Sequence, residues 1–170
     1  MRASVLTGIA AIAACWLALL PPARAEAPAP AVVVVGGVVA APLRLDADAL
    51  HKLPRRDVDA IEHGRQGHFE GVALADVLRI AGAPIGEALR GKNLALYVCV
   101  SASDGYRAVF SLAELDPAVR ESEVILADHR DGRVLDAREG PFRIVVKDDK
   151  RPARWVRQVV AIDLLAAPAR

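Results

Sequence analysis

Short runs of valine, isoleucine and leucine that end at glycine, proline or aspartate recur along this chain, and they constrain its fold more than any other feature. The run at 94–100 is apolar on both faces, which predicts a central strand. The segments 142–147 and 155–164 alternate between apolar and mixed positions, which predicts strands with one buried face. We therefore predict an α+β fold, with a compact, mixed but mostly antiparallel sheet and a few short helices.

Local signals predict the elements that join these strands. Apolar residues recur at helical spacing over 72–80, which is the best helix in the chain. Asp46 and Ser111 are suitable N-caps for two further short helices, because their side chains can accept from the first free N–H groups. The dipeptide at 131–132, Asp-Gly, favours a tight hairpin between two more strands.

The N-terminus has the pattern of an export signal. Arg2 precedes a largely apolar stretch at 3–20, and the residues up to Ala25 present the small-x-small pattern that signal peptidase cleaves. We predict a signal peptide at 1–25, a Pro/Ala-rich tail at 26–31 and one domain at 32–165, because the 145 remaining residues suffice for one core. The expected location is the periplasm or the medium, with no membrane anchor after cleavage.

The cysteine content and the net charge further limit the class of protein. Cys15 ends a lipoprotein-like box, which leaves a lipidated N-terminus as an alternative to cleavage after Ala25. After cleavage only Cys99 remains, so an internal disulfide is excluded. Without Arg2 and Arg24 the 22 basic residues become 20, against 21 acidic ones, for a net charge of −1. This balance gives no indication of nucleic acid or of an anionic membrane as a partner.

Five fragments of the sequence together resemble one family. In chain order they are 71–78, 81–82, 103–106, 139–146 and 154–157. Their order and spacing resemble the molybdopterin-binding domain of the sulfite oxidase family, over about 32–164. The resemblance implies a compact α+β domain whose cofactor is molybdenum held by a pterin dithiolene. Members of this family are commonly exported oxidoreductases that transfer oxygen atoms or reduce oxidised substrates.

The chain departs from the family at the residue that binds the metal. The resemblance implies a cysteine ligand in the loop just before the segment that begins at Phe69, but the loop 62–68 contains no cysteine. A soft thiolate suits this metal, and a harder donor would change its electronics. We expect Cys99 to be a small buried residue of the central strand, and therefore no substitute.

Basic residues crowd the region 143–157 and form the first candidate site. They are Arg143, Lys147, Lys150, Arg151, Arg154 and Arg157. Strand alternation predicts Arg143 and Lys147 on one face, and Trp155 with Arg157 on one face of the next strand, so that guanidinium groups and an aromatic plane could meet a phosphate-bearing ligand. The resemblance also implies pterin-phosphate binding here. The alternative is a solvated loop at 147–151.

Two smaller groups complete the candidate sites. His63 and His68 lie in the predicted loop that follows a short strand at 58–61, where they could bind a metal or could simply be solvated. Asp104 and Tyr106 could line a ligand pocket, or could form an ordinary turn. The sequence assigns no catalytic residue.

These observations support a ranked set of functions. The first is an exported ligand- or partner-binding module of the molybdopterin-domain type that lacks thiolate-dependent catalysis, with a pterin or another anionic small molecule as the ligand. The alternative is a molybdopterin-dependent periplasmic oxidoreductase whose metal takes oxygen or histidine in place of sulfur and that works with an exported redox partner. A third class is an adaptor that binds another exported protein without any cofactor.

Overall fold

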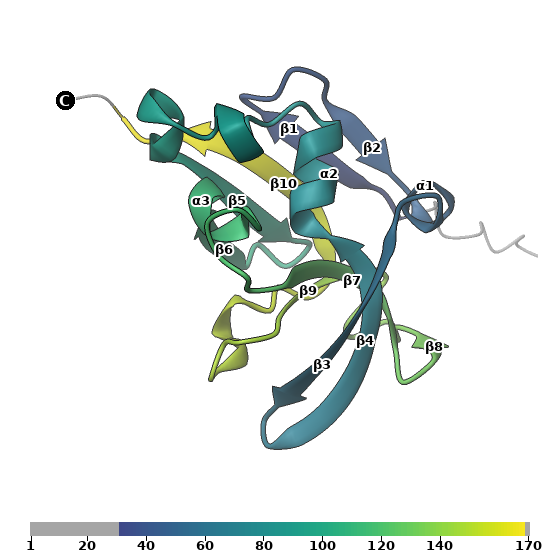
Figure 1. Ribbon diagram of the computed structural model, residues 1–170. Helices are drawn as coiled ribbons and strands as arrows, with labels where there is room; N and C mark the ends of the chain where they lie inside the picture. Colours follow the sequence, from purple (N-terminus) through teal and green to yellow (C-terminus); the bar gives the residue numbers. More distant parts are fainter. Residues whose placement is uncertain (1–30, 169–170) are drawn as a thin grey trace, which may run out of the picture.

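The computed structural model describes residues 31–168, and two five-stranded sheets dominate it (Figure 1). The first sheet is antiparallel except where β1 and β10 run parallel. Its strands, in spatial order, are β2 (Leu43–Leu45), β1 (Val33–Gly37), β10 (Val159–Ala166), β5 (Leu96–Ala102) and β6 (Arg107–Ser111).

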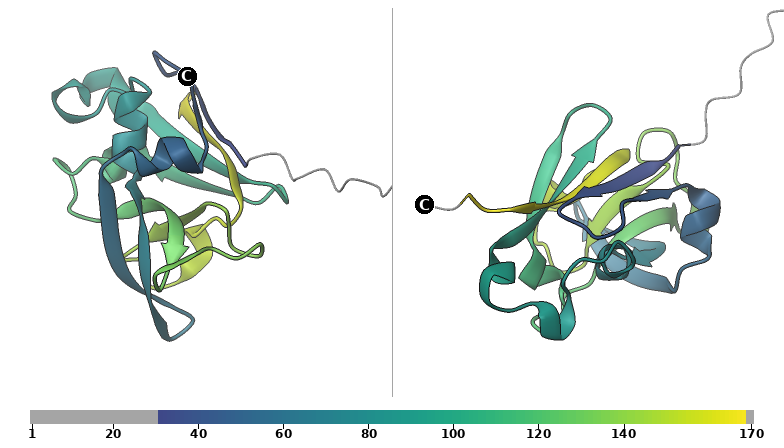
Figure 2. Two further views of the ribbon diagram at one scale, coloured as in Figure 1. Left: turned by 90° about the vertical axis from the view of Figure 1, so that its right-hand side faces the viewer. Right: turned by 90° about the horizontal axis from the view of Figure 1, so that it is seen from above.

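The second sheet is antiparallel throughout and is built around a long hairpin. Its strands are β3 (Arg55–Glu62), β4 (Arg65–Ala73), β7 (Val124–Arg130), β8 (Arg133–Val134) and β9 (Arg143–Val146). The far end of the β3–β4 hairpin extends away from the first sheet (Figure 1, Figure 2). β7 is paired with β4, with β8 and with β9, so it is the centre of this sheet.

Short helices connect the strands. The α-helices are α1 (Ala47–His51), α2 (Leu74–Ile80) and α3 (Leu112–Leu115), and 3-10 turns occur at Gly86–Ala88, Gly91–Ala95 and Pro152–Arg154. Asp46 caps α1 by accepting from the Ala49 N–H at 2.8 Å. Ser111 and Glu114 form a reciprocal capping box at the start of α3. Both predicted N-caps are therefore confirmed.

One hydrophobic core joins the two sheets. Fully buried side chains come from the first sheet, such as Val98 and Ile162, and from the second, such as Phe69 and Ile125. The side chain of Leu78 on α2 is buried in the same cluster. Because each sheet buries one face on the other, the chain needs no disulfide to hold the two together.

The predicted α+β fold is confirmed, but several boundaries were wrong. The helix predicted at 72–80 begins at Leu74, because β4 continues to pair with β7 through Ala73. The strand predicted at 155–164 begins only at Val159, after the turn at Pro152–Arg154.

The predicted signal at 1–25, with its alternative at Cys15, and most of the tail at 26–31 lie outside the described residues. Within 31–168, no helix has the length and apolar character to span a bilayer.

Candidate functional site

The segment 62–68, predicted as a loop, is instead the end of the β3–β4 hairpin. Glu62 and Arg65 pair across the strands, and only His63 and Gly64 form the turn. Both turn residues have positive φ, 49° for His63 and 79° for Gly64. Positive φ at both positions is typical of the two-residue turns whose backbone twist matches that of the flanking strands. The prediction of a loop is wrong because it depended on glycine as a loop signal, whereas Gly67 lies within β4.

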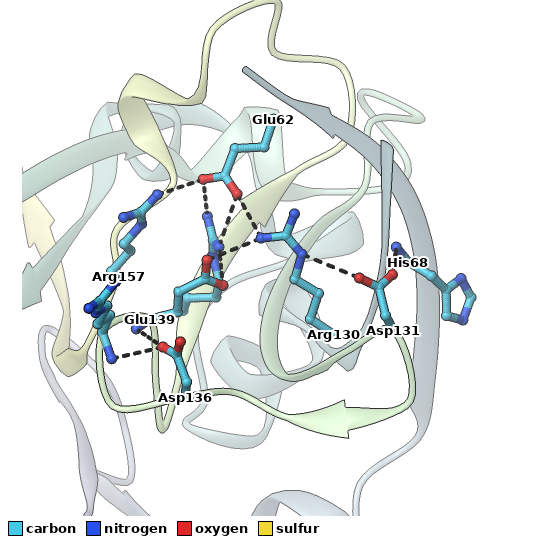
Figure 3. A network of polar contacts seen from close by, with 9 residues as sticks. Glu62, His68, Arg130, Asp131, Asp136, Glu139 and Arg157 are labelled. Carbon is cyan, nitrogen blue, oxygen red and sulfur yellow. Dashed lines mark hydrogen bonds and ion pairs between the residues drawn. The ribbon is translucent and has the colours of Figure 1, made fainter. Parts of the chain in front are cut away.

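Glu62 ends β3 and lies at the centre of a buried ion-pair network. Its side chain is 6% exposed, and it accepts from three guanidinium groups (Figure 3). Arg143 Nη2 and Arg157 Nη2 each donate to Oε1 at 2.9 Å. Arg130 Nη1 donates to Oε2 at 3.1 Å, and Arg143 Nη1 approaches the same oxygen at 3.4 Å.

A second carboxylate, Glu139, completes the network (Figure 3). Its Oε2 accepts from Arg143 Nη1 at 2.6 Å, and its Oε1 accepts from Arg130 Nη1 at 3.1 Å. Arg143 is fully buried, so its charge requires both glutamates as partners.

The environment of Glu62 strongly favours its ionised form. Burial alone would raise the pKa of this carboxyl group, but hydrogen bonds from Arg143 and Arg157, together with their positive charges, outweigh burial and lower the pKa to about 2. Glu62 is therefore an anion at every pH at which the protein would work.

Two aromatic rings form the apolar side of this network. Phe69 on β4 and Trp155 meet edge to face, with ring centroids 5.7 Å apart. The guanidinium carbon of Arg143 lies 5.2 Å from the Phe69 centroid and 5.5 Å from that of Trp155, and Arg130 lies 5.1 Å from Phe69. These cation–π contacts fix the rings and the guanidinium groups together.

A pocket opens above the network. Its volume is about 340 Å³, which falls within the range of about 300–1,000 Å³ that is typical of small-molecule sites. The residues that line it come from distant parts of the chain and are Glu62, His63, Ala102, Asp104, Tyr106, Arg138, Pro152, Ala153, Trp155, Arg157 and Gln158. The candidate functional site is this pocket.

Four of the nine residues named as candidates for ligand binding line the pocket, and Arg157 is one of them. Asp104 and Tyr106 form the predicted turn, in which Asp104 Oδ1 accepts from the Tyr106 N–H at 2.8 Å, and they also belong to the pocket wall. The Tyr106 hydroxyl donates to the Ala153 carbonyl oxygen at 2.6 Å, which fixes the ring. Trp155 is the fourth, but it precedes β10 rather than sharing a strand face with Arg157.

Arg143 and Arg154 are engaged in ion pairs. Arg143 lies beneath the pocket and not in its lining. Arg154 donates to Asp149 at 2.7 and 3.0 Å and to Glu114 at 3.2 Å, and the hydrogen bond to Asp149 is the main reason that the pKa of Arg154 is raised. Both guanidinium groups thus already have protein carboxylates as partners.

The other three basic residues, Lys147, Lys150 and Arg151, do not line the pocket. Lys147 lies 3.5 Å from Glu123 at the surface, so it does not share a face with the buried Arg143 as predicted. Arg151 is exposed. This agrees with the alternative of a solvated loop at 147–151.

The two histidines of the predicted metal site are separated. His63 lines the pocket, whereas His68 lies within β4 and pairs with Asp59 at 2.9 Å, a contact that raises the pKa of His68. Among the described residues, the group of side chains with metal-binding spacing is instead His51, Asp128 and His129.

Sequence reasoning missed Glu139 and Arg130 as site residues, and it did not predict that Glu62 lies in an ion-pair network. One signal could have found Glu62: Val58, Ala60 and Glu62 are the buried positions of β3, so a charged residue occupies an apolar position of an alternating strand. A carboxylate at such a position requires buried cationic partners.

The residues of the pocket fit an anionic ligand better than a metal centre that needs sulfur. The lining includes two residues that carry guanidinium groups, Arg138 and Arg157. Cys99, predicted to be buried in the central strand, is half-buried, and it does not line the pocket. The pocket therefore offers hydrogen-bond donors and no thiolate.

Comparison with known proteins links the chain to one family and to solved structures. The model of the family described as oxidoreductase molybdopterin binding domain matches residues 62–170. The crystal structure of the sulfane dehydrogenase SoxCD from Paracoccus pantotrophus superposes with a TM-score of 0.64 and 18% identity, over 82% of this chain and 40% of that chain. The present chain thus corresponds to less than half of the length of that protein. No curated protein matches.

Proposed function

Because the chain belongs to the oxidoreductase molybdopterin-binding domain family, we propose that its pocket binds an anionic, pterin-type ligand without supplying a thiolate to a metal. The chain would then be a ligand- or partner-binding module of this fold. In this family the pterin-held molybdenum supplies the redox chemistry. The observation that carries the proposal is the carboxylate of Glu62, bound by arginines in the segment where the family resemblance implies a cysteine.

Glu62 cannot take over as a metal ligand in this arrangement. A carboxylate has about four lone-pair sites, and Glu62 receives four guanidinium contacts, two on each oxygen. Binding a metal would require breaking at least one of these charged contacts. Its role is therefore to hold the arginines in place.

Arg157 is the residue best placed to hold the ligand's anionic group. Its side chain is 46% exposed and lines the pocket, and it commits one Nη2 donor to Glu62 out of five N–H donors. Arg138 lines the same pocket. Trp155 also lines the pocket, with 4% of its surface exposed.

Replacing Arg157 by alanine should lower pterin occupancy about tenfold, because a hydrogen bond to a charged group contributes about 1.5–3 kcal/mol. Occupancy is measured from the fluorescence of oxidised pterin released from protein expressed in a host that makes molybdopterin. Arg151→Ala is the matched control, since Arg151 is exposed and does not line the pocket. Equal occupancy in wild type and Arg157→Ala would refute this role.

A second function rests on His63, an imidazole in the pocket wall next to Glu62. Here the chain would be a molybdopterin-dependent oxidoreductase in which the metal takes a nitrogen or oxygen ligand, and an exported protein would be its redox partner. Dye-linked reductase activity that is lost in His63→Asn would favour this function. Asparagine is chosen because it tolerates the positive φ at this position.

We also propose that the chain is exported, on the strength of the signal pattern at 1–25. Mass spectrometry of protein from the periplasm should show a chain that begins at Glu26. Retention of Met1 would contradict cleavage after Ala25, and a chain found only in the cytoplasm would contradict export.

A further inference from the structure

A second cluster of ligating side chains lies at the junction of α1 and β7. His51 is the last residue of α1, and Asp128 and His129 are consecutive residues of β7. None of the three lines the pocket described above. One ligating atom from each lies within 4.8 Å of those from the other two.

A β-bulge explains why two consecutive residues of a strand can act together. Neighbouring side chains of a regular strand point to opposite faces, but the pairing of β4 with β7 shifts here, because Glu70 pairs with His129 and Gly71 with Ala127. Asp128 is left as the extra residue, and its Oδ1 lies 2.8 Å from His129 Nδ1. A side chain on Gly71 would clash with the backbone of Leu126, so glycine is required on the strand opposite.

Asp128 retains coordinating capacity towards His51. Arg55 donates to both of its oxygens, at 2.6 and 2.9 Å, and with His129 this accounts for three of about four lone-pair sites. The remaining site is on Oδ2, which lies 3.8 Å from His51 Nε2. The separation of these two atoms is too long for a hydrogen bond. It is close to the separation of two donor atoms that bind one zinc ion tetrahedrally, which is about 3.3 Å when each donor lies about 2.0–2.1 Å from the ion.

The charge and exposure of the cluster favour an ion that can enter from solvent. Asp128 is 5% exposed and pairs with Arg55 on its inner side at 2.6 Å. His51 is 51% exposed and forms the outer side. Glu70, opposite His129 in β4, adds negative charge that offsets Arg55.

We propose that His51, Asp128 and His129 form a binding site for Zn²⁺. Two imidazoles and one carboxylate suit a borderline ion such as zinc, whereas Mg²⁺ and Ca²⁺ prefer oxygen ligands alone. Three protein ligands leave the fourth tetrahedral position to water. Arg55 holds the carboxylate in place from the inner side, as a supporting contact of the kind that orients metal ligands.

Calorimetric titration of the purified chain with Zn²⁺ tests this site. We expect one ion per chain, and His51→Gln should weaken binding at least tenfold while leaving the thermal unfolding of the metal-free protein unchanged, because the His51 side chain is half exposed. The double variant His63→Asn, His68→Gln is the matched control, since it removes two histidines outside the cluster.

Three results would overturn the proposal. They are no binding of Zn²⁺ by the wild type, undiminished binding by His51→Gln, and loss of binding in the His63/His68 variant instead. With Co²⁺ as the probe, a visible spectrum typical of tetrahedral coordination should appear in the wild type and be lost in His51→Gln.

Discussion

Replacing Glu62 by glutamine should lower the free energy of unfolding by about 3 kcal/mol. The substitution preserves the size of the side chain but removes the charge that faces the fully buried Arg143, and breaking a buried pair from one side typically costs about 3–5 kcal/mol. We expect the lower end of this range of free energies, because Glu139 still pairs with Arg143. Urea unfolding of the two proteins at neutral pH measures this difference.

The same variant should alter how stability depends on pH. The pKa of Glu62 is about 2 in the folded protein and 4.5 ordinarily, so the unfolded chain binds this proton more readily. The contribution of Glu62 to stability is therefore complete above about pH 4.5 and is lost as the pH falls towards 2. Glu62→Gln should lack this part of the acid dependence, whereas Glu121→Gln, at an exposed position, should retain it. Identical acid profiles for Glu62→Gln and the wild type would contradict the proposed network.

Replacing Phe69 by alanine should destabilise the protein by about 3–5 kcal/mol, as is usual for truncating a buried aromatic residue. Phe69 is fully buried, it meets Trp155 edge to face, and its ring contacts two guanidinium groups, so the cavity would lie directly under the ion-pair network. Chemical unfolding measures the loss.

The variant Phe69→Leu separates the contribution of the aromatic ring to stability from the contribution of side-chain volume. Leucine fills much of the space but provides no π face for Arg130 and Arg143, so we expect less than half of the loss that alanine causes. A cost below about 1 kcal/mol for Phe69→Ala would show that these residues do not pack as described.

The fold class could be predicted because its signals are local. The capping residues Asp46 and Ser111 each act within three residues of their own position, and the alternation of β10 is visible in eight consecutive residues. The family could be predicted from five fragments in order, and the match to residues 62–170 confirms it. Boundaries failed where tertiary pairing overrides local pattern, as in the extension of β4 through Ala73.

The candidate site could be predicted only in part, because its partners are far apart in the sequence. Arg143 and Glu62 are 81 residues apart, and Arg157 and Glu62 are 95 apart. A cluster of basic residues in the sequence indicates positive charge but does not show which carboxylates neutralise it. Arg143 and Arg154 therefore looked available to a ligand, although each is paired within the protein.

The most direct test is the molybdenum content of the chain purified from the periplasm of cells that make molybdopterin, measured together with its pterin content. We predict that pterin is present and that dye-linked reductase activity is absent whatever molybdenum the pterin dithiolene carries, because the pocket contains no thiolate to complete the metal's ligands and its carboxylate is saturated by arginines. One molybdenum atom per chain, with pterin and reductase activity, would contradict this prediction.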